Sequence, residues 1–161
     1  MLSETLTAHE NELDKYKEVA CPPYLPFLDF AALLKNTDVI KVQFNREKLN
    51  EQVSQVFEKY DLMLTPTLAT AAFEAGDMGP LGPAKVNGQD ASPSSWVCFT
   101  YPFNFTGQPA ASVPCGFNSE GLPVGLQIVG RRFDEALVLR AAAAFEKAHP
   151  WRDKKPPLTS R

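Results

Sequence analysis

The side chains that could supply a nucleophile or a base are scattered along this 161-residue sequence. Hydrolysis of an amide or ester needs a nucleophile, a base that takes its proton and donors that hold the oxyanion. The sequence contains neither a GxSxG nucleophile elbow nor a P-loop. Its two histidines, His9 and His149, stand near opposite ends of the chain, so neither is favoured as a catalytic base.

Lys85 and the serines that follow it give a formal Ser–Lys combination, with Ser92, Ser94 and Ser95 as candidate nucleophiles. They lie in a stretch punctuated by glycine and proline, without the strand-to-helix turn that would hold a nucleophile rigidly. Solvated loop residues are therefore the favoured interpretation, and we predict no catalytic residue in this chain. Histidine, cysteine and carboxylate residues are not grouped at metal-ligand spacings, so neither a metal nor a cofactor is expected.

The cysteines and the overall charge narrow the class of protein further. Cys21, Cys98 and Cys115 are an odd number without close spacing, which fits neither a disulfide framework nor a zinc site and predicts buried free thiols. A net charge of −3 with scattered basic residues argues against a nucleic-acid surface. No apolar run has the roughly 18 residues that a membrane helix needs. The charged N-terminus carries no signal-peptide core, so a cytoplasmic location is expected.

Periodic apolar residues predict helices before the first strand and a last helix near the C-terminus. The predicted helices are residues 3–18, 28–40, 45–60 and 135–148. The third has the clearest apolar stripe, which consists of Leu49, Val53, Val56, Phe57 and Tyr60. The last is capped by Asp134 and is expected to bury Leu137, Ala141, Ala144, Phe145 and Ala148.

Three short apolar runs predict strands at residues 62–64, 111–117 and 123–129, the last two joined by a turn at 118–121. Residues 69–95 read as a long loop, followed by a helical turn at 96–100. The fold class is therefore α/β, with helices flanking a small mixed β-sheet. Since three open strands leave edges that need covering, we expect the chain to belong to something larger or to form a homo-oligomer through an exposed sheet edge.

Four ordered segments carry a resemblance to a known family. They are YDLMLTPT at 60–67, FTYPFNFTGQPAASVPCG at 99–116, GLPVGLQIVG at 121–130 and the segment 134–151 that begins DEALVL and ends at a proline and a tryptophan. Together they resemble the C-terminal part of the amidase signature family. The resemblance covers residues 45–151 strongly and the first 44 weakly, which implies a helical segment at 1–44, an amidase-like core at 45–151 and a tail at 152–161.

The resemblance also implies a chemistry that this chain does not complete. Members of the family use a serine nucleophile, a second serine in a cis peptide and a lysine, in and around a Gly/Ser-rich run of the type GGSSGG. No such run occurs here, so the chain resembles the last third of an amidase. The implied function is a contribution of sheet and substrate-tunnel wall to a hydrolase that converts a small carboxamide to a carboxylate. The chain alone is expected to be inactive.

Four residues match segments that border the substrate tunnel in the family: Thr67, Phe99, Phe103 and Asn104. Simpler roles stay open for some of them. Asn104 can instead brace the loop through backbone hydrogen bonds, and Phe103 and Phe105 can instead be core residues. Gln127, inside an apolar strand, needs hydrogen-bond partners and is expected to brace the sheet.

Two alternative functions remain at this point. One is a non-catalytic module that pairs with itself or with another amidase chain. The other is part of an A-type subunit of a tRNA-dependent amidotransferase, which is less favoured because no basic cluster that would face tRNA is visible. Neither a nucleic-acid nor a membrane partner is expected.

Overall fold

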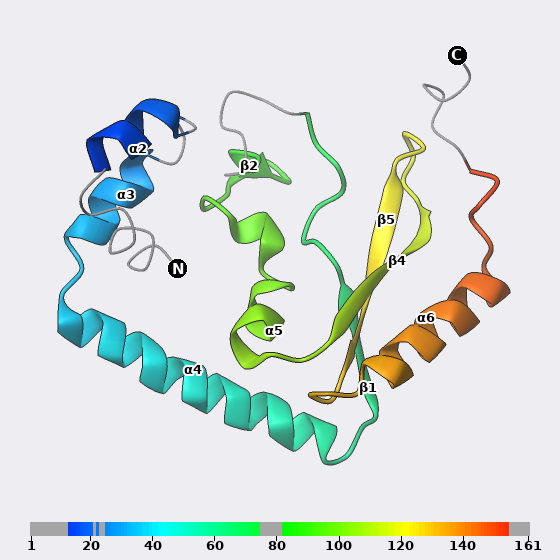
Figure 1. The fold of residues 1–161 in the computed structure, drawn as a ribbon. Coiled ribbons are helices and arrows are strands. Elements are labelled where there is room, and N and C mark those ends of the chain that lie inside the picture. The colour runs from blue at the N-terminus through cyan, green and yellow to red at the C-terminus, as the bar shows by residue number, and fades with distance from the viewer. Residues whose placement is uncertain (1–12, 21, 23–24, 75–81, 155–161) are drawn as a thin grey trace.

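The structure is a computed structural model that describes residues 13–20, 22, 25–74 and 82–154 (Figure 1). Three helices come first: α2 (Leu13–Val19), α3 (Leu25–Ala32) and α4 (Asn36–Phe57). The elements that follow are β1 (Leu62–Pro66), β2 (Lys85–Val86), β3 (Gln89–Asp90), the 3-10 turn η3 (Ser95–Val97), α5 (Tyr101–Thr106), β4 (Ala110–Phe117), β5 (Pro123–Gly130) and α6 (Glu135–Ala148). The first part of the predicted helix at 3–18, His9 and Cys21 lie outside the described residues.

The predicted three-stranded sheet is confirmed, and its strands lie in the order β1-β5-β4. Both pairings are antiparallel, so the sheet is antiparallel in the described residues rather than mixed as expected. The hairpin between β4 and β5 closes where predicted, because the Asn118 carboxamide oxygen accepts the backbone N–H groups of Glu120 and Leu122. Gly121 completes the turn with a φ of 79°, a conformation that glycine adopts without steric cost.

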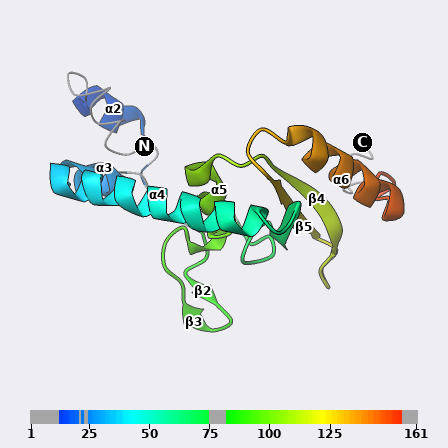
Figure 2. The ribbon, with the colours of Figure 1, turned by 90° about the horizontal axis from the view of Figure 1, so that it is seen from below.

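The central strand β5 is covered on both faces. On one face, Val129 packs with Val53 and Phe57 of α4 and with Phe103 of α5. On the other, α6 lies along β4 and β5, and a Cβ atom at Gly130 would stand only 2.6 Å from a methyl of Val138. Figure 2 shows α5 and α6 on opposite sides of the sheet. The prediction that this strand is buried from both sides is correct for residues 127–130.

The boundaries of the second and third helices differ from those predicted. The helix predicted at 28–40 ends at Ala32, and a new helix begins at Asn36. Lys35 is extended there, and its N–H donates to the Asp38 carboxylate at 3.2 Å, which caps the new helix. Helix α4 therefore starts nine residues before the predicted position. Its first half carries exposed apolar side chains, and these form no stripe in the sequence.

The predicted buried stripes of α4 and α6 are only partly right. In α4, Val53 and Phe57 are buried but Tyr60 is 62% exposed, since the helix has already ended at Phe57. In α6, Asp134 accepts the N–H of Leu137 as predicted. Val138 is buried there, although it was not expected to be. Ala144 and Ala148 are exposed because the face that meets the sheet is rotated toward Val138.

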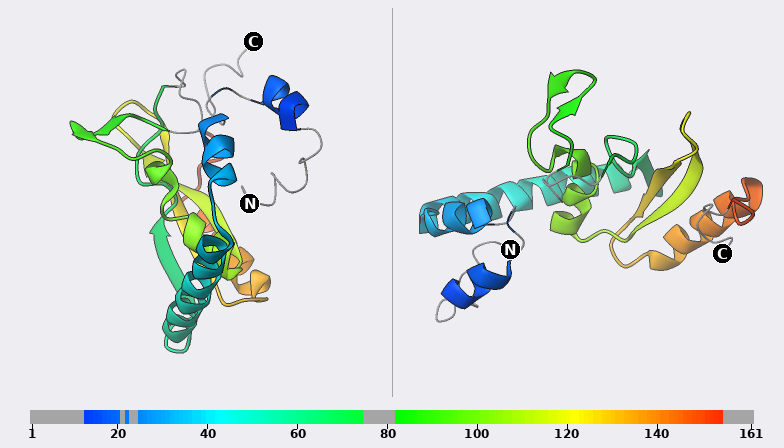
Figure 3. Two further views of the ribbon diagram at one scale, coloured as in Figure 1. Left: turned by 90° about the vertical axis from the view of Figure 1, so that its left-hand side faces the viewer. Right: turned by 90° about the horizontal axis from the view of Figure 1, so that it is seen from above.

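The long loop predicted at 69–95 contains a small hairpin, β2–β3, which projects from the body of the molecule (Figure 3). Asn87 and Gly88 both have positive φ values, of 51° and 77°, as a two-residue type I′ turn requires. The Asn-Gly pair favours this type of turn, and it is the sequence signal that could have predicted the hairpin. The predicted helical turn near Trp96 is confirmed as η3, but α5 was not predicted, because its six residues are too few to show a helical period.

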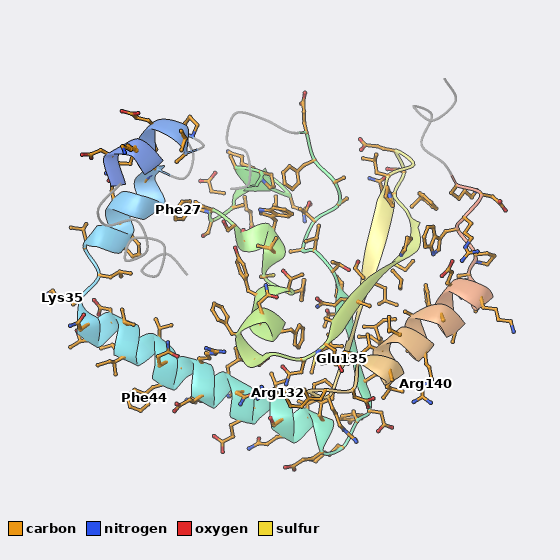
Figure 4. All side chains as sticks on the ribbon, viewed as in Figure 1. Phe27, Lys35, Phe44, Arg132, Glu135 and Arg140 are labelled. Carbon is orange, nitrogen blue, oxygen red and sulfur yellow. The ribbon has the colours of Figure 1, made fainter. Side chains whose placement is uncertain are left out.

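The molecule is open, with α2 and α3 standing away from the sheet at the far end of α4 (Figure 1). The first half of α4 exposes several large apolar side chains, including Phe44, which is 66% exposed and projects away from α5 (Figure 4). Large apolar side chains are also exposed elsewhere in the described part, among them Leu64 at 60% and Leu139 at 65%. The described elements thus leave much apolar surface uncovered.

Candidate functional site

A hollow of about 340 Å³ lies against the face of the sheet that α5 covers. Its walls come from the end of β1, from α5 and from the strands β4 and β5. Three of the four residues predicted to contact substrate line it, namely Thr67, Phe103 and Asn104. The sequence analysis did not single out the other lining residues, apart from Gln127: they are Thr100, Gln108, Ala110, Ala111 and Ser112.

Helix α5 places Phe103 and Asn104 on this hollow. It contains Pro102 in its first turn, which fixes the backbone without losing a helical hydrogen bond. It ends at Gly107, whose φ of 76° lets its N–H return to the Phe103 carbonyl oxygen at 2.8 Å. The Thr106 hydroxyl donates to the Pro102 carbonyl oxygen at 2.9 Å, which tightens the single turn between them.

Phe103 serves two roles, because the same buried ring belongs to the core cluster and to the wall of the hollow. Phe105 is half exposed, so its interpretation as a core residue is wrong: it lies on the opposite side of the short helix. Within the described part of the chain, the Asn104 carboxamide makes no side-chain hydrogen bond. The structure therefore gives no sign of the predicted loop brace, and the side chain is open to the hollow.

Gln127 braces the sheet as predicted. Its side chain is 4% exposed, and its amide nitrogen donates to the Thr65 hydroxyl and to the Phe99 carbonyl oxygen, both at 2.9 Å. A carbonyl oxygen can only accept, so the amide nitrogen must be the atom that faces Phe99. Phe99 itself does not line the hollow. It is tied to the site through this backbone contact, which links the segment before α5 to strands β1 and β5.

Thr67 and Ser112 form a second polar feature, with their hydroxyl oxygens 2.7 Å apart. Thr67 follows β1 and Ser112 lies on β4, so the pair spans the intervening strand β5. The Thr67 N–H donates to the Gly125 carbonyl oxygen at 2.9 Å, which anchors this end of the bridge. The two hydroxyls also line a neighbouring hollow of about 300 Å³, whose walls include Leu68, Pro114, Pro123 and Val124.

The other candidate nucleophiles and bases do not converge. The Lys85 ammonium lies 3.6 Å from the Asp90 carboxylate across the projecting hairpin β2–β3. The ring of His149 is exposed and stacks on Phe145, with ring centroids 5.2 Å apart. Cys98 and Cys115 are free as predicted, but they are exposed rather than buried, because both fall on surfaces that no other described element covers.

The described ranges hold neither a cluster of metal-ligating side chains nor a helix suited to cross a bilayer. No group of three or more histidine, cysteine, aspartate or glutamate side chains is arranged there to hold a metal ion. Among the described helices, none combines the length and the apolar character needed to span a bilayer.

Solved structures share this fold. A bacterial aryl acylamidase of the amidase signature enzymes superposes with a TM-score of 0.78 at 32% identity, over 92% of this chain and 31% of that one. The 6-aminohexanoate cyclic dimer hydrolase, solved with its substrate, superposes with a TM-score of 0.71 at 30% identity, over 84% of this chain and 29% of that one. The fold is thus the α/β fold of the amidase signature enzymes.

Comparisons of the sequence indicate the same family. The sequence model of the Amidase family matches residues 27–139. The chain is 43% identical over 118 residues to the A-type subunit of the glutamyl-tRNA(Gln) amidotransferase of Chloroflexus aggregans, covering 73% of this chain and 22% of that protein. It is 41% identical over 128 residues to the acylamidase of Rhodococcus erythropolis, covering 78% and 26%. This chain belongs to the amidase signature family, and it spans about a quarter of the length of these curated relatives.

Proposed function

We propose that this chain supplies the central strands and one wall of the substrate cleft in an enzyme that hydrolyses carboxamides to carboxylates and ammonia or an amine. The observation that carries the proposal is the hollow beside α5, in which an apolar ring (Phe103), an open carboxamide (Asn104) and a hydroxyl (Thr67) converge. Apolar walls with a few placed polar groups are typical of sites for small ligands. The likeness to an aryl acylamidase and an acylamidase supports an acyl amide as the substrate.

In this proposal the nucleophile comes from further polypeptide, and the chain alone is inactive. The sequence has no Gly/Ser-rich run that matches the family's catalytic serines. The exposed apolar side chains of the described part, such as Phe44 on α4, support a large partner surface. Both edge strands of the sheet, β1 and β4, are also open to pairing in the described part of the fold. A second copy of this chain at one of these edges is the alternative occupant.

A second candidate is a role in an amidotransferase, as part of its A-type subunit. The 43% identity to the Chloroflexus protein favours it. The likeness to an acylamidase and to an aryl acylamidase favours the hydrolase instead.

The proposal is tested by mixing the purified chain with the upstream polypeptide of the Rhodococcus acylamidase, produced without its matching C-terminal quarter. Carboxylate release from butyramide and from acetanilide is then measured, with light scattering to report whether a complex forms. We expect no turnover by the chain alone and turnover in the complex. Turnover by the chain alone that disappears when Ser92, Ser94 and Ser95 are replaced by alanine would overturn the claim of inactivity. A complex that forms and hydrolyses neither amide would overturn the proposed wall.

A further inference from the structure

The Thr67–Ser112 hydroxyl pair stands at the border between two hollows of different character. The hollow beside α5 is lined by amide and hydroxyl side chains, including Asn104 and Gln127. The neighbouring hollow is lined mostly by Leu68 and other apolar residues. Thr67 and Ser112 line both. A molecule that fills both hollows must therefore pass the two hydroxyls.

The backbone beneath the pair is glycine for a steric reason. A Cβ atom at Gly125 would stand 2.7 Å from the Thr67 hydroxyl oxygen and 2.9 Å from the Ser112 hydroxyl oxygen. Side-chain carbons do not approach other atoms this closely, so any other residue at position 125 would push the hydroxyls away. The glycine does not have a positive φ. Its absent side chain thus serves the close approach of the pair and not the course of the backbone.

The pair keeps hydrogen-bonding capacity that the described part of the chain does not use. Two hydroxyls carry two hydrogens, and the contact between them uses one. Neither oxygen has another hydrogen-bond partner among the described side chains and backbone groups. One O–H therefore remains to donate, and lone pairs remain to accept. A carboxamide has the complementary set, since its carbonyl oxygen accepts and its N–H groups donate.

We propose that Thr67 and Ser112 together form a specificity-determining site that hydrogen-bonds the amide group of a substrate with an apolar acyl chain. The acyl chain extends into the hollow lined by Leu68 and Val124, and the polar end of the molecule faces Asn104 and Gln127. This inference rests on the proposed function for its substrate class. It adds two residues, Ser112 and Gly125, to the site and fixes the orientation of the ligand along it.

The binding site is tested on the 161-residue chain alone, by following backbone amide NMR signals while butyramide is added. We expect shifts at Thr67, Ser112 and Gly125. Replacement of the pair by Thr67→Val and Ser112→Ala should weaken binding about fivefold, the effect of one ordinary hydrogen bond. Gly125→Ala should weaken it similarly although both hydroxyls remain, while Thr67→Ser keeps the affinity.

The control is Ser119→Ala, in the exposed turn between β4 and β5, which should bind butyramide as the unmodified chain does. Each variant is first checked for the dispersed spectrum of a folded chain. The inference is overturned if butyramide shifts none of the three signals, or if the double variant binds it equally well. In the acylamidase complex, hydrolysis that proceeds with unchanged KM and kcat in the double variant would refute the inference and leave the proposed function standing. Binding of butyramide without any hydrolysis by the complex would refute the proposed function and leave the inference standing.

Discussion

Replacement of Gln127 by leucine tests whether one buried carboxamide holds the site together. Leucine has a similar volume, so the change removes hydrogen bonds without opening a large cavity. Two bonds of 2.9 Å are lost, to the Thr65 hydroxyl and to the Phe99 carbonyl oxygen. Each is worth about 1 kcal/mol, and leaving a buried acceptor unpaired adds about 1–3 kcal/mol. We expect the free energy of unfolding to fall by roughly 3–5 kcal/mol, which lowers the melting temperature by roughly 6–20 °C.

The assay is thermal and urea unfolding of the 161-residue chain followed by circular dichroism. The matched control is Gln89→Leu, which makes the same chemical change at an exposed position of β3 and should leave the melting temperature nearly unchanged. A Gln127→Leu chain that melts within a degree or two of the unmodified chain would show that the two hydrogen bonds add nothing. The segment before α5 would then need another anchor.

Three other predictions concern a packing contact, a helix cap and an ion pair. Gly130→Ala should lower the free energy of unfolding by about 1–3 kcal/mol, because its new methyl meets Val138. A second change, Val138→Ala, should relieve the clash. Urea unfolding of both variants measures this. Asp134→Ala should cost about 1 kcal/mol through loss of the cap of α6, also by urea unfolding. The hydrogen bond and charge of Asp29 raise the pKa of Lys17 above its ordinary 10.5, so the contribution of this ion pair is full below that pH and is lost as the pH rises through the raised value. An NMR titration of the Lys17 side chain should show its pKa return toward 10.5 in Asp29→Asn.

The parts of the fold that the sequence predicted are those with a regular pattern and a local stop signal. The strand at 123–130 is bounded by a turn with a glycine, and the helix at 135–148 has a capping aspartate at its start. The start of α4 had no such pattern, because its exposed apolar residues are not spaced as a buried face. These residues are exposed in the described structure, so no buried face gives their spacing a helical period.

The site was predictable only where a motif named its residues. Thr67, Phe103 and Asn104 were chosen from the resemblance to the family, and the structure brings them to one hollow. Ser112 could not be found in this way, since its role depends on a contact across β5 with a residue 45 positions away. The only local trace is Gly125, and a glycine in a strand has many possible causes. These residues lie close together because of the pairing register of the three strands.

The position of the exposed apolar side chains bears on the two kinds of partner proposed above. In the first half of α4, Ile40, Val42 and Phe44 are 54%, 56% and 66% exposed. Exposed apolar patches are typical of protein–protein interfaces. Pairing of one edge strand with a second copy would leave the apolar side chains of α4 near Phe44 exposed, because the first half of that helix extends away from the sheet (Figure 1). A longer amidase polypeptide that covers the edges and α4 together therefore accounts for the surface better than a homodimer does.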